Sequence, residues 1–379
     1  MQMNFDNYKT PGQLIEALLE QRGWTQRVLA IVLDISESAL NKVVAGKQSM
    51  TAELALALED VFKVEAAQFL NLQSSYDLAR ARLVARPDPE RATRAQIYAG
   101  LPISDMIKRG WLDASDARDR AKVEVALAKF FNVDSLDQIE VLPHAAKKTA
   151  VAEGTTLAQL AWLYRVRQIS SEMLVAPFST FGARRAAERL KELLLSAEEA
   201  RKVPRILAEA GIRFVLVESL PSAKIDGVCF WLDETAPVVG MSMRFDRIDN
   251  FYFVLRHELE HVIQGHGKAV ITIDSDVEGD RDGDAIAEEE CVANLAAADF
   301  CVPKKTMDSF IARKAPFFSE RDILGLAATL KVHPGLVAGQ LRRRTGRYDR
   351  FGSHLVKIRS IIAPGAVVDG WGDIAPVGA

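Results

Sequence analysis

The sequence has few cysteines and no long apolar run. Its 379 residues include only Cys229, Cys291 and Cys301, an odd number without close pairing, which excludes a disulfide framework and favours a reducing compartment. No stretch of roughly 18 apolar residues occurs, so no transmembrane helix is expected. The N-terminal MQMNFDNYKTPGQ lacks the apolar core of a signal peptide. These absences predict a cytoplasmic protein that does not bind a membrane.

The sequence also lacks an excess of positive charge. It has 48 Lys and Arg against 51 Asp and Glu, so any nucleic-acid binding would depend on a local surface rather than on the whole molecule. Hydrophobic residues make up 49% and charged residues 26%, which is typical of a globular protein with a buried core. No internal repeat is recognisable. The length predicts two or three domains.

We predict an α+β protein that is mostly helical and has three domains. Residues 1–86 show a series of short helical patterns, and residues 87–204 are predicted to form a helical linker domain. Residues 205–379 begin with three segments rich in Val, Ile, Phe and Trp, which predict a small sheet. Helical patterns follow the sheet. The third domain therefore combines strands and helices.

A helix is expected over about 250–264, where Asp249 or Asn250 can cap its start and Gly265 can end it. This helix contains the motif His-Glu-x-x-His. Residues four apart lie on one face of a helix, so His257 and His261 can bind one Zn²⁺ together. Glu258 points close to the same face and can act as the general base that carries a proton from water to a leaving amine. Glu260 lies on another face and is a poor candidate for a ligand.

A catalytic zinc usually takes a third protein ligand from another element. The next predicted helix, over about 286–300, is rich in alanine and begins with acidic residues. A carboxylate buried where this helix packs against the histidine helix would be unfavourable without a cation. The pattern alone leaves three candidates open: Glu288, Glu289 and Glu290.

The segments FYFVLRHELEH and EEECVANLAAADFCVP together resemble the ImmA/IrrE metallo-endopeptidases. The resemblance covers about 205–360 and implies a zincin-like peptidase domain whose third zinc ligand is Glu290. Two positions depart from the family pattern. Glu260 stands where the family usually has Gly, and His266 follows the second histidine ligand by five residues rather than four. Neither departure changes a ligand or the general base, so we expect a competent site.

The segment WTQRVLAIVLDISESALNKVVAGKQSMT has the layout of a helix-turn-helix, in which Leu40 and Val43 are expected to face the core. The stretch 10–79 resembles the XRE-type domain of HigA-like antitoxins. This resemblance implies binding to a DNA operator, and we expect a homodimer on an inverted repeat. Residues 1–82 hold 8 Lys and Arg against 10 Asp and Glu, so a domain kept for protein contacts is the alternative. The candidate DNA contacts are Gln26, Ser36, Ser38, Asn41, Lys42 and Lys47.

Taken together, the motifs predict a transcriptional regulator with a zinc-dependent endopeptidase domain. The family resemblance implies that it cleaves a repressor or toxin-like protein encoded nearby, and strand 238–245 is the expected edge where substrate binds. One alternative is a HigA-like antitoxin or repressor without proteolysis, in which the metal site is structural or sensory. Another is a peptidase whose helix-turn-helix only recruits a protein partner.

We expect the peptidase to be latent until a signal activates it, because a permanently active cytoplasmic peptidase would be harmful. Two charged segments are candidates for regulation. The acidic loop 274–290 leads into the helix that carries Glu290, and its ordering could place this ligand. The stretch 342–359 holds seven Lys and Arg against one Asp and could bind single-stranded nucleic acid, although a solvated surface is the simpler interpretation.

Overall fold

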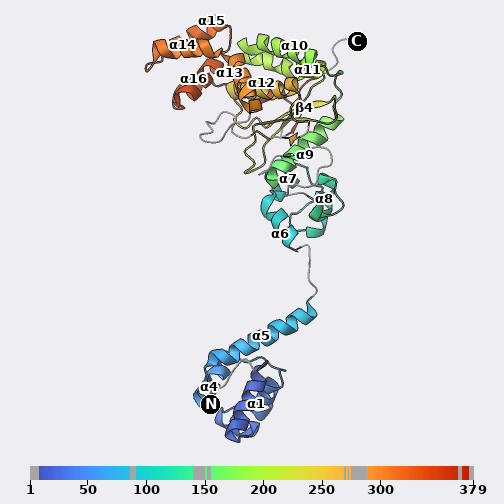
Figure 1. The fold of residues 1–379 in the computed structure, drawn as a ribbon, viewed down its shortest axis with the longest axis vertical. Helices are drawn as coiled ribbons and strands as arrows, with labels where there is room; N and C mark the ends of the chain where they lie inside the picture. The colour runs from blue at the N-terminus through green and yellow to red at the C-terminus, as the bar shows by residue number, and fades with distance from the viewer. Residues whose placement is uncertain are drawn as a thin grey trace. The chain divides into compact units, whose positions relative to one another are not determined.

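The computed structural model describes residues 8–85, 91–139, 150–151, 155–268, 270–271, 273–274, 288–365 and 369–374. The chain divides into two compact units, residues 1–89 and residues 90–379 (Figure 1). The predicted fold class is confirmed, since helices dominate both units and a sheet lies in the second. No helix among the described residues is long and apolar enough to cross a membrane.

The described part of the first unit contains five helices. Threonine or serine caps four of them, because each hydroxyl accepts a hydrogen bond from the backbone N–H three residues later. Apolar residues at helical spacing bury a core that includes Leu14, Leu29, Leu40 and Phe69. The helices are α1 (Pro11–Arg22), α2 (Gln26–Val32), α3 (Glu37–Val44), α4 (Ala52–Phe62) and α5 (Ala66–Val84).

The second unit contains a mixed sheet between helices. Before the sheet come α6 (Arg91–Gly100), α7 (Ile103–Lys108), α8 (Arg120–Phe131), α9 (Leu157–Glu172), α10 (Thr180–Lys191) and α11 (Val203–Glu209). After its main strands come α12 (Ile248–Gln264), α13 (Glu288–Cys301), α14 (Lys304–Lys314), α15 (Glu320–Leu330), α16 (Pro334–Thr345) and α17 (Arg359–Ile362). The strands are β1 (Ala150–Val151), β2 (Arg213–Val217), β3 (Gly227–Trp231), β4 (Pro237–Met241), β5 (Val270–Ile271), β6 (Ile273–Asp274) and β7 (Asp369–Gly370).

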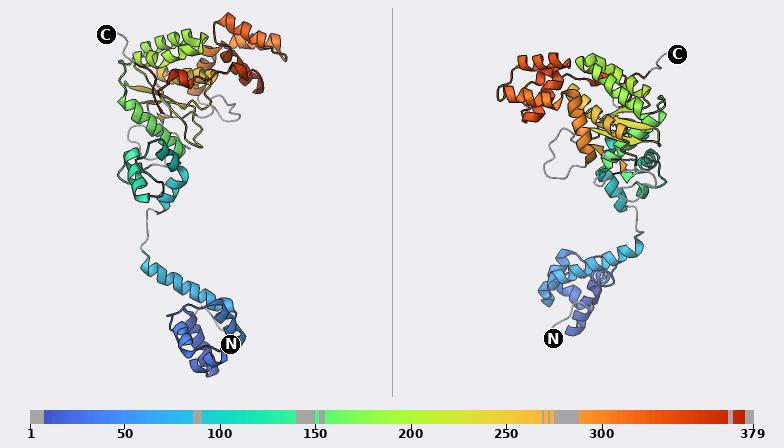
Figure 2. Two further views of the ribbon diagram at one scale, coloured as in Figure 1. Left: turned by 180° about the vertical axis from the view of Figure 1, so that it is seen from behind. Right: turned by 45° about the horizontal axis from the view of Figure 1, so that its top comes forward.

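The five-stranded sheet has the order β6-β3-β4-β2-β7, and β1 pairs separately with β5. Helices cover both faces of the sheet (Figures 1 and 2). Phe214 and Leu216 of β2 face the core that contains α12, whereas Val215 and Val217 face the core that contains α9. This alternation explains why β2, β3 and β4 are almost entirely apolar.

The expectation of an edge strand at 238–245 is wrong. β4 lies inside the sheet, parallel to β2 and antiparallel to β3, so its backbone already pairs on both sides. Its apolar sequence has a different physical cause, which is burial between two helical layers. An extended peptide can pair only with an outer strand of a sheet.

Residues 90–204 of the predicted linker region 87–204 lie within the second unit. Its α8 and α9 share one hydrophobic cluster with β2, and its α10 shares the other cluster with α12. Trp162 of α9 is fully buried, and its Nε1 donates a hydrogen bond to the carbonyl of Val217 at 2.8 Å. The helices of this region therefore support the sheet from both sides. The division into three domains stays a prediction.

Helix α12 is the central helix of the second unit and differs from the sequence prediction at its start. It begins at Ile248 after the extended residue Arg247, so the expected cap at 249 or 250 is wrong. Asp249 instead accepts hydrogen bonds at 3.0 and 2.7 Å from Arg247 and lies in the first turn, where a carboxylate is favoured by the helix dipole. Gly265 ends α12 in the left-handed conformation, as predicted.

α15 and α16 are joined by a short turn that has two features in common with the turn between α2 and α3. Lys331 has a φ of 56° in this turn and Asp34 has a φ of 54° in the turn between α2 and α3. His333 caps α16 as Ser36 caps α3. However, the N-terminal half of α16 is buried. This helix pair therefore stabilises the fold and cannot present that half of α16 to a DNA groove.

Candidate metal centre and helix-turn-helix

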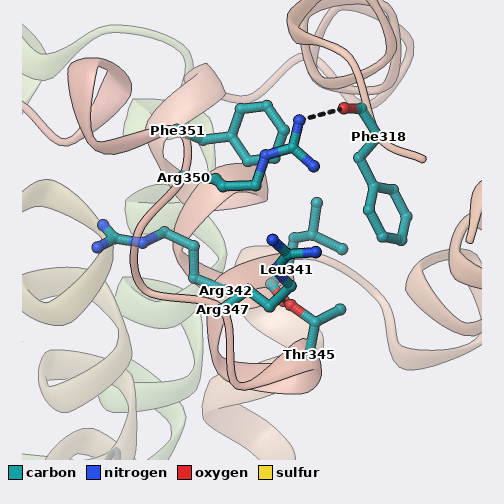
Figure 3. A pocket seen from close by; sticks show the side chains of 7 residues that line it. All are labelled: Phe318, Leu341, Arg342, Thr345, Arg347, Arg350 and Phe351. Carbon is teal, nitrogen blue, oxygen red and sulfur yellow. Dashed lines mark hydrogen bonds between the residues drawn. The ribbon is translucent and has the colours of Figure 1, made fainter. Parts of the chain in front are cut away.

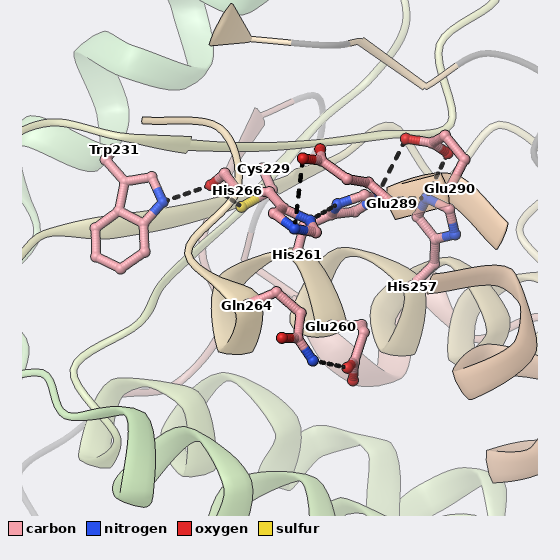
Figure 4. Close-up of polar contacts among 9 residues, drawn as sticks. All are labelled: Cys229, Trp231, His257, Glu260, His261, Gln264, His266, Glu289 and Glu290. Carbon is pink, nitrogen blue, oxygen red and sulfur yellow. Dashed lines mark hydrogen bonds and ion pairs between the residues drawn. The ribbon is translucent and has the colours of Figure 1, made fainter. Parts of the chain in front are cut away.

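The two motif histidines lie one turn apart on the buried face of α12. His257 is fully buried and His261 is nearly so. Their Nε2 atoms are 3.1 Å apart, so the two rings converge on one point (Figure 4). The aromatic and aliphatic residues of α12 keep this face inside the protein, where the imidazoles have few rotamers available.

Glu290 joins the histidines from the first turn of α13. Its Oε2 lies 3.4 Å from His257 Nε2, and its Oε1 lies 3.5 Å from His261 Nε2. The approach of α13 to α12 depends on small residues, because Ala293 and Ala297 follow Glu290 at helical spacing and are both fully buried. Of the three glutamates that the pattern left open, the structure therefore places Glu290 beside both histidines.

The separations of these three side chains fit a zinc ion. One donor atom from each lies within 4.8 Å of the others. Tetrahedral ligands at 2.0–2.1 Å from zinc would be about 3.3 Å from one another. The two histidine Nε2 atoms are 3.1 Å apart, and each lies 3.4 or 3.5 Å from a different oxygen of Glu290, so these separations are close to that value. Two imidazoles and one carboxylate are also the donor set of a common class of catalytic zinc site.

Glu258 lies against a glycine of the sheet. Its side chain is fully buried, and an ideal Cβ built on Gly227 of β3 would come within 2.2 Å of Glu258 Oε1. Gly227 thus leaves the space that the carboxylate fills. Gly227 is not among the predicted site residues, although an isolated glycine in an apolar strand often marks a close approach of another segment.

Glu260 points away from the three donor residues. Its carboxylate accepts a hydrogen bond of 2.6 Å from Gln264 (Figure 4) and another of 2.6 Å from Arg256. Burial raises the pKa of Glu260, but the hydrogen bonds from Gln264 and Arg256 outweigh this effect and hold the pKa below its ordinary value. Glu260 therefore forms a local ion pair with Arg256 on α12.

The acidic loop expected at 274–290 falls largely outside the described residues, because 275–287 are not among them. The basic stretch 342–359 is described. Three of its arginines surround a small pocket (Figure 3), and two others have partners within the unit: Arg344 bonds to Asp308 at 2.5 Å and Arg343 lies 4.4 Å from the ring centre of Phe253. The pocket is lined by Phe318, Leu341, Arg342, Thr345, Arg347, Arg350 and Phe351.

The candidate DNA contacts lie on α3 and beside it. Ser38, Asn41 and Lys42 are exposed on α3, and Lys47 is exposed just beyond it. Leu40 and Val43 on the opposite face are buried, as predicted. The polar side chains of α3 are therefore available to a ligand while its apolar side holds the helix in place.

Two of the candidates serve the fold as well. Ser36 caps α3, because its Oγ accepts a hydrogen bond from Ala39 N at 3.1 Å. Gln26 begins α2 and is half-buried. Its Oε1 has no hydrogen-bond partner among the described residues. Ser36 can still donate its hydroxyl proton to a phosphate, because capping uses only a lone pair.

Comparison with known proteins concerns the first unit. Residues 15–69 match the helix-turn-helix family. The uncharacterized HTH-type transcriptional regulator YddM of Escherichia coli K12 is 30% identical over 79 residues, which are 21% of this chain and 84% of that protein. Virulence-associated protein I of Dichelobacter nodosus is 36% identical over 72 residues, which are 19% of this chain and 67% of that protein. Through its first unit, the chain belongs to the helix-turn-helix family.

Proposed function

We propose that the protein is a DNA-binding transcriptional regulator whose second unit is a zinc-dependent endopeptidase. The first part rests on the helix-turn-helix match, on a relative that is named a transcriptional regulator, and on the exposed polar face of α3. Asn41 and Ser38 would meet base edges, and Lys42 and Lys47 would meet phosphates. Because residues 1–82 carry more acidic than basic residues, stable binding would need a homodimer on an inverted repeat.

The peptidase part rests mainly on one observation, which is the convergence of His257, His261 and Glu290 at ligand spacing. These residues would hold Zn²⁺. A zinc ion in such a site supplies Lewis acidity, which activates water and polarises a peptide carbonyl. Glu258, one residue from the first ligand, would take the proton of the attacking water and pass it to the leaving amine.

The substrate would be a protein rather than a small peptide. The resemblance of 205–360 to ImmA/IrrE enzymes supports a repressor or toxin-like protein encoded nearby as the substrate. A latent activity fits such a role, because cleavage of a repressor must wait for a signal. A regulator without proteolysis, with a structural or sensory metal, is the competing function.

The test compares cleavage of the candidate partner by the wild type and by Glu258→Gln, each loaded with zinc. Glutamine keeps the shape of the side chain but cannot take a proton, so we expect zinc binding without cleavage. Equal cleavage by both proteins would point to a contaminating protease. Absence of cleavage by the wild type under every signal tried, with normal repression by both proteins, would favour the regulator without proteolysis.

A further inference from the structure

A third histidine, His266, contacts His261 on the side of its ring that faces away from the other two proposed ligands. His261 Nε2 faces His257 and Glu290, while its other ring nitrogen, Nδ1, lies 3.0 Å from Nδ1 of His266 (Figure 4). Two imidazole nitrogens at this distance form a hydrogen bond only if one carries a proton and the other offers a lone pair. The direction of this bond decides which nitrogen of His261 can bind a metal.

The surroundings of His266 favour one direction. Its Nε2 lies 3.7 Å from Oε1 of Glu289, the residue before the proposed ligand Glu290. A neighbouring carboxylate favours the proton on Nε2 of His266, which leaves Nδ1 of this ring as an acceptor. His261 then donates its Nδ1–H, and its Nε2 lone pair points toward His257 and Glu290.

The backbone fixes the position of His266 in the structure. The N–H of His266 donates to the carbonyl of His261 at 2.9 Å, and its own carbonyl accepts a hydrogen bond of 2.7 Å from Trp231 Nε1. The neighbouring Gly267 has a φ of 78°, and a Cβ there would lie 2.5 Å from the carbonyl oxygen of Cys229. The segment after α12 is thus held against β3.

We propose that His266 is a positioning residue that holds His261 in the tautomer with its proton on Nδ1 and none on Nε2, and that Glu289 orients His266. This inference rests on the proposed zinc site and assigns a role to the two residues beside it. Outer partners of metal-binding histidines typically change metal affinity by about 10–100-fold when they are removed. His266 would therefore contribute to zinc affinity without touching the ion.

The first measurement is zinc affinity of the full chain, by competition with a chelator of known affinity. We expect His266→Ala to lower the affinity by about 10–100-fold. His266→Asn should stay within a few-fold of the wild type, because its amide oxygen can accept the hydrogen bond from His261 Nδ1–H. Glu289→Gln should have a smaller effect than His266→Ala, since it removes only the orientation of the second ring.

The second measurement needs no metal. Nitrogen-15 NMR of the histidine-labelled, metal-free protein at pH 8 reports the tautomer of each of the six histidines. We expect His261 to carry its proton on Nδ1 in the wild type and in His266→Asn, and to show both tautomers in His266→Ala. Rescue by asparagine distinguishes positioning from a general loss of folding.

The outcomes separate this inference from the proposed function. Equal zinc affinity of the wild type and His266→Ala would overturn the inference and leave the zinc site standing. A wild type that binds no zinc would overturn the proposed peptidase, while the tautomer of His261 would still test the positioning. A proton found on Nε2 of His261 in the wild-type protein would overturn the inference in either case.

Discussion

The carboxylate of Glu258 packs directly against the backbone of Gly227. The first residue of β3 has no side chain, and the carboxylate of Glu258 fills the position where a Cβ would lie. The same Cβ would also approach Val254 Cγ1 at 2.9 Å, one turn earlier on α12. The sheet therefore determines where the proposed general base can lie, while α12 determines where the metal ligands lie.

Gly227→Ala should impair catalysis more than zinc binding. The added methyl group would displace the carboxylate of Glu258, which is fully buried and has little room to move. We expect near-normal zinc content and a loss of cleavage of about 100-fold or more, because general acid–base catalysis typically contributes at least about that factor. Gly325→Ala is the control, because its Cβ meets no atom within 4 Å and it should cleave normally. Normal cleavage by Gly227→Ala would mean that the position of Glu258 is not decisive.

The choice between neighbouring glutamates can be tested by alanine substitution. Glu290→Ala should lose most zinc affinity, because this carboxylate faces both histidine Nε2 atoms. Glu289→Ala should retain most of it, because Glu289 faces His266 instead. Zinc titration of both proteins measures the difference. A larger loss in Glu289→Ala would show that the ligand is assigned to the wrong glutamate.

The helix-turn-helix makes separate predictions for a base contact and a phosphate contact. Asn41→Ala should weaken binding to the specific operator by roughly 1–3 kcal/mol if Asn41 pairs with a base. Lys42→Ala should weaken binding to all sequences and flatten the salt dependence. Gel-shift titrations at several salt concentrations measure both effects. Absence of a sequence-selective shift at moderate salt, with folded protein in excess, would favour a domain that contacts protein.

The packing of α16 on α12 predicts a change in stability. A Cβ on Gly339 would lie 2.2 Å from Asp249 Oδ2, and Asp249 is itself held by Arg247. Gly339→Ala should lower the free energy of unfolding of the second unit by roughly 1–3 kcal/mol, as overpacking does. Chemical denaturation measures this loss. An unchanged unfolding midpoint would show that α16 can shift away from α12 without cost.

Local features of the fold could be predicted from the sequence where one short pattern determines them. The three strands, the end of α12 at Gly265 and the burial of Leu40 and Val43 follow from side-chain periodicity and glycine. Features that depend on distant segments could not be predicted. The internal place of β4 depends on pairing with β2 and β3, and apolar composition alone does not distinguish an edge strand from a buried one.

The metal centre shows the same division. The spacing of His257 and His261 predicts that their rings share a face, because this follows from the helix repeat. The contact of Glu258 with Gly227 joins residues 31 positions apart, and no local pattern contains it. The sequence does not predict the contact of His266 with His261, because this contact depends on the backbone turn at Gly265.

The central claim is that the second unit binds one zinc ion, and elemental analysis tests it most directly. Protein purified without added zinc, measured together with His261→Ala, gives the zinc content per chain. We expect near-stoichiometric zinc in the wild type and most of it lost in the variant, because His261 supplies one of three ligands. A folded wild-type protein that contains no zinc, and takes up none when zinc is supplied, would contradict the account.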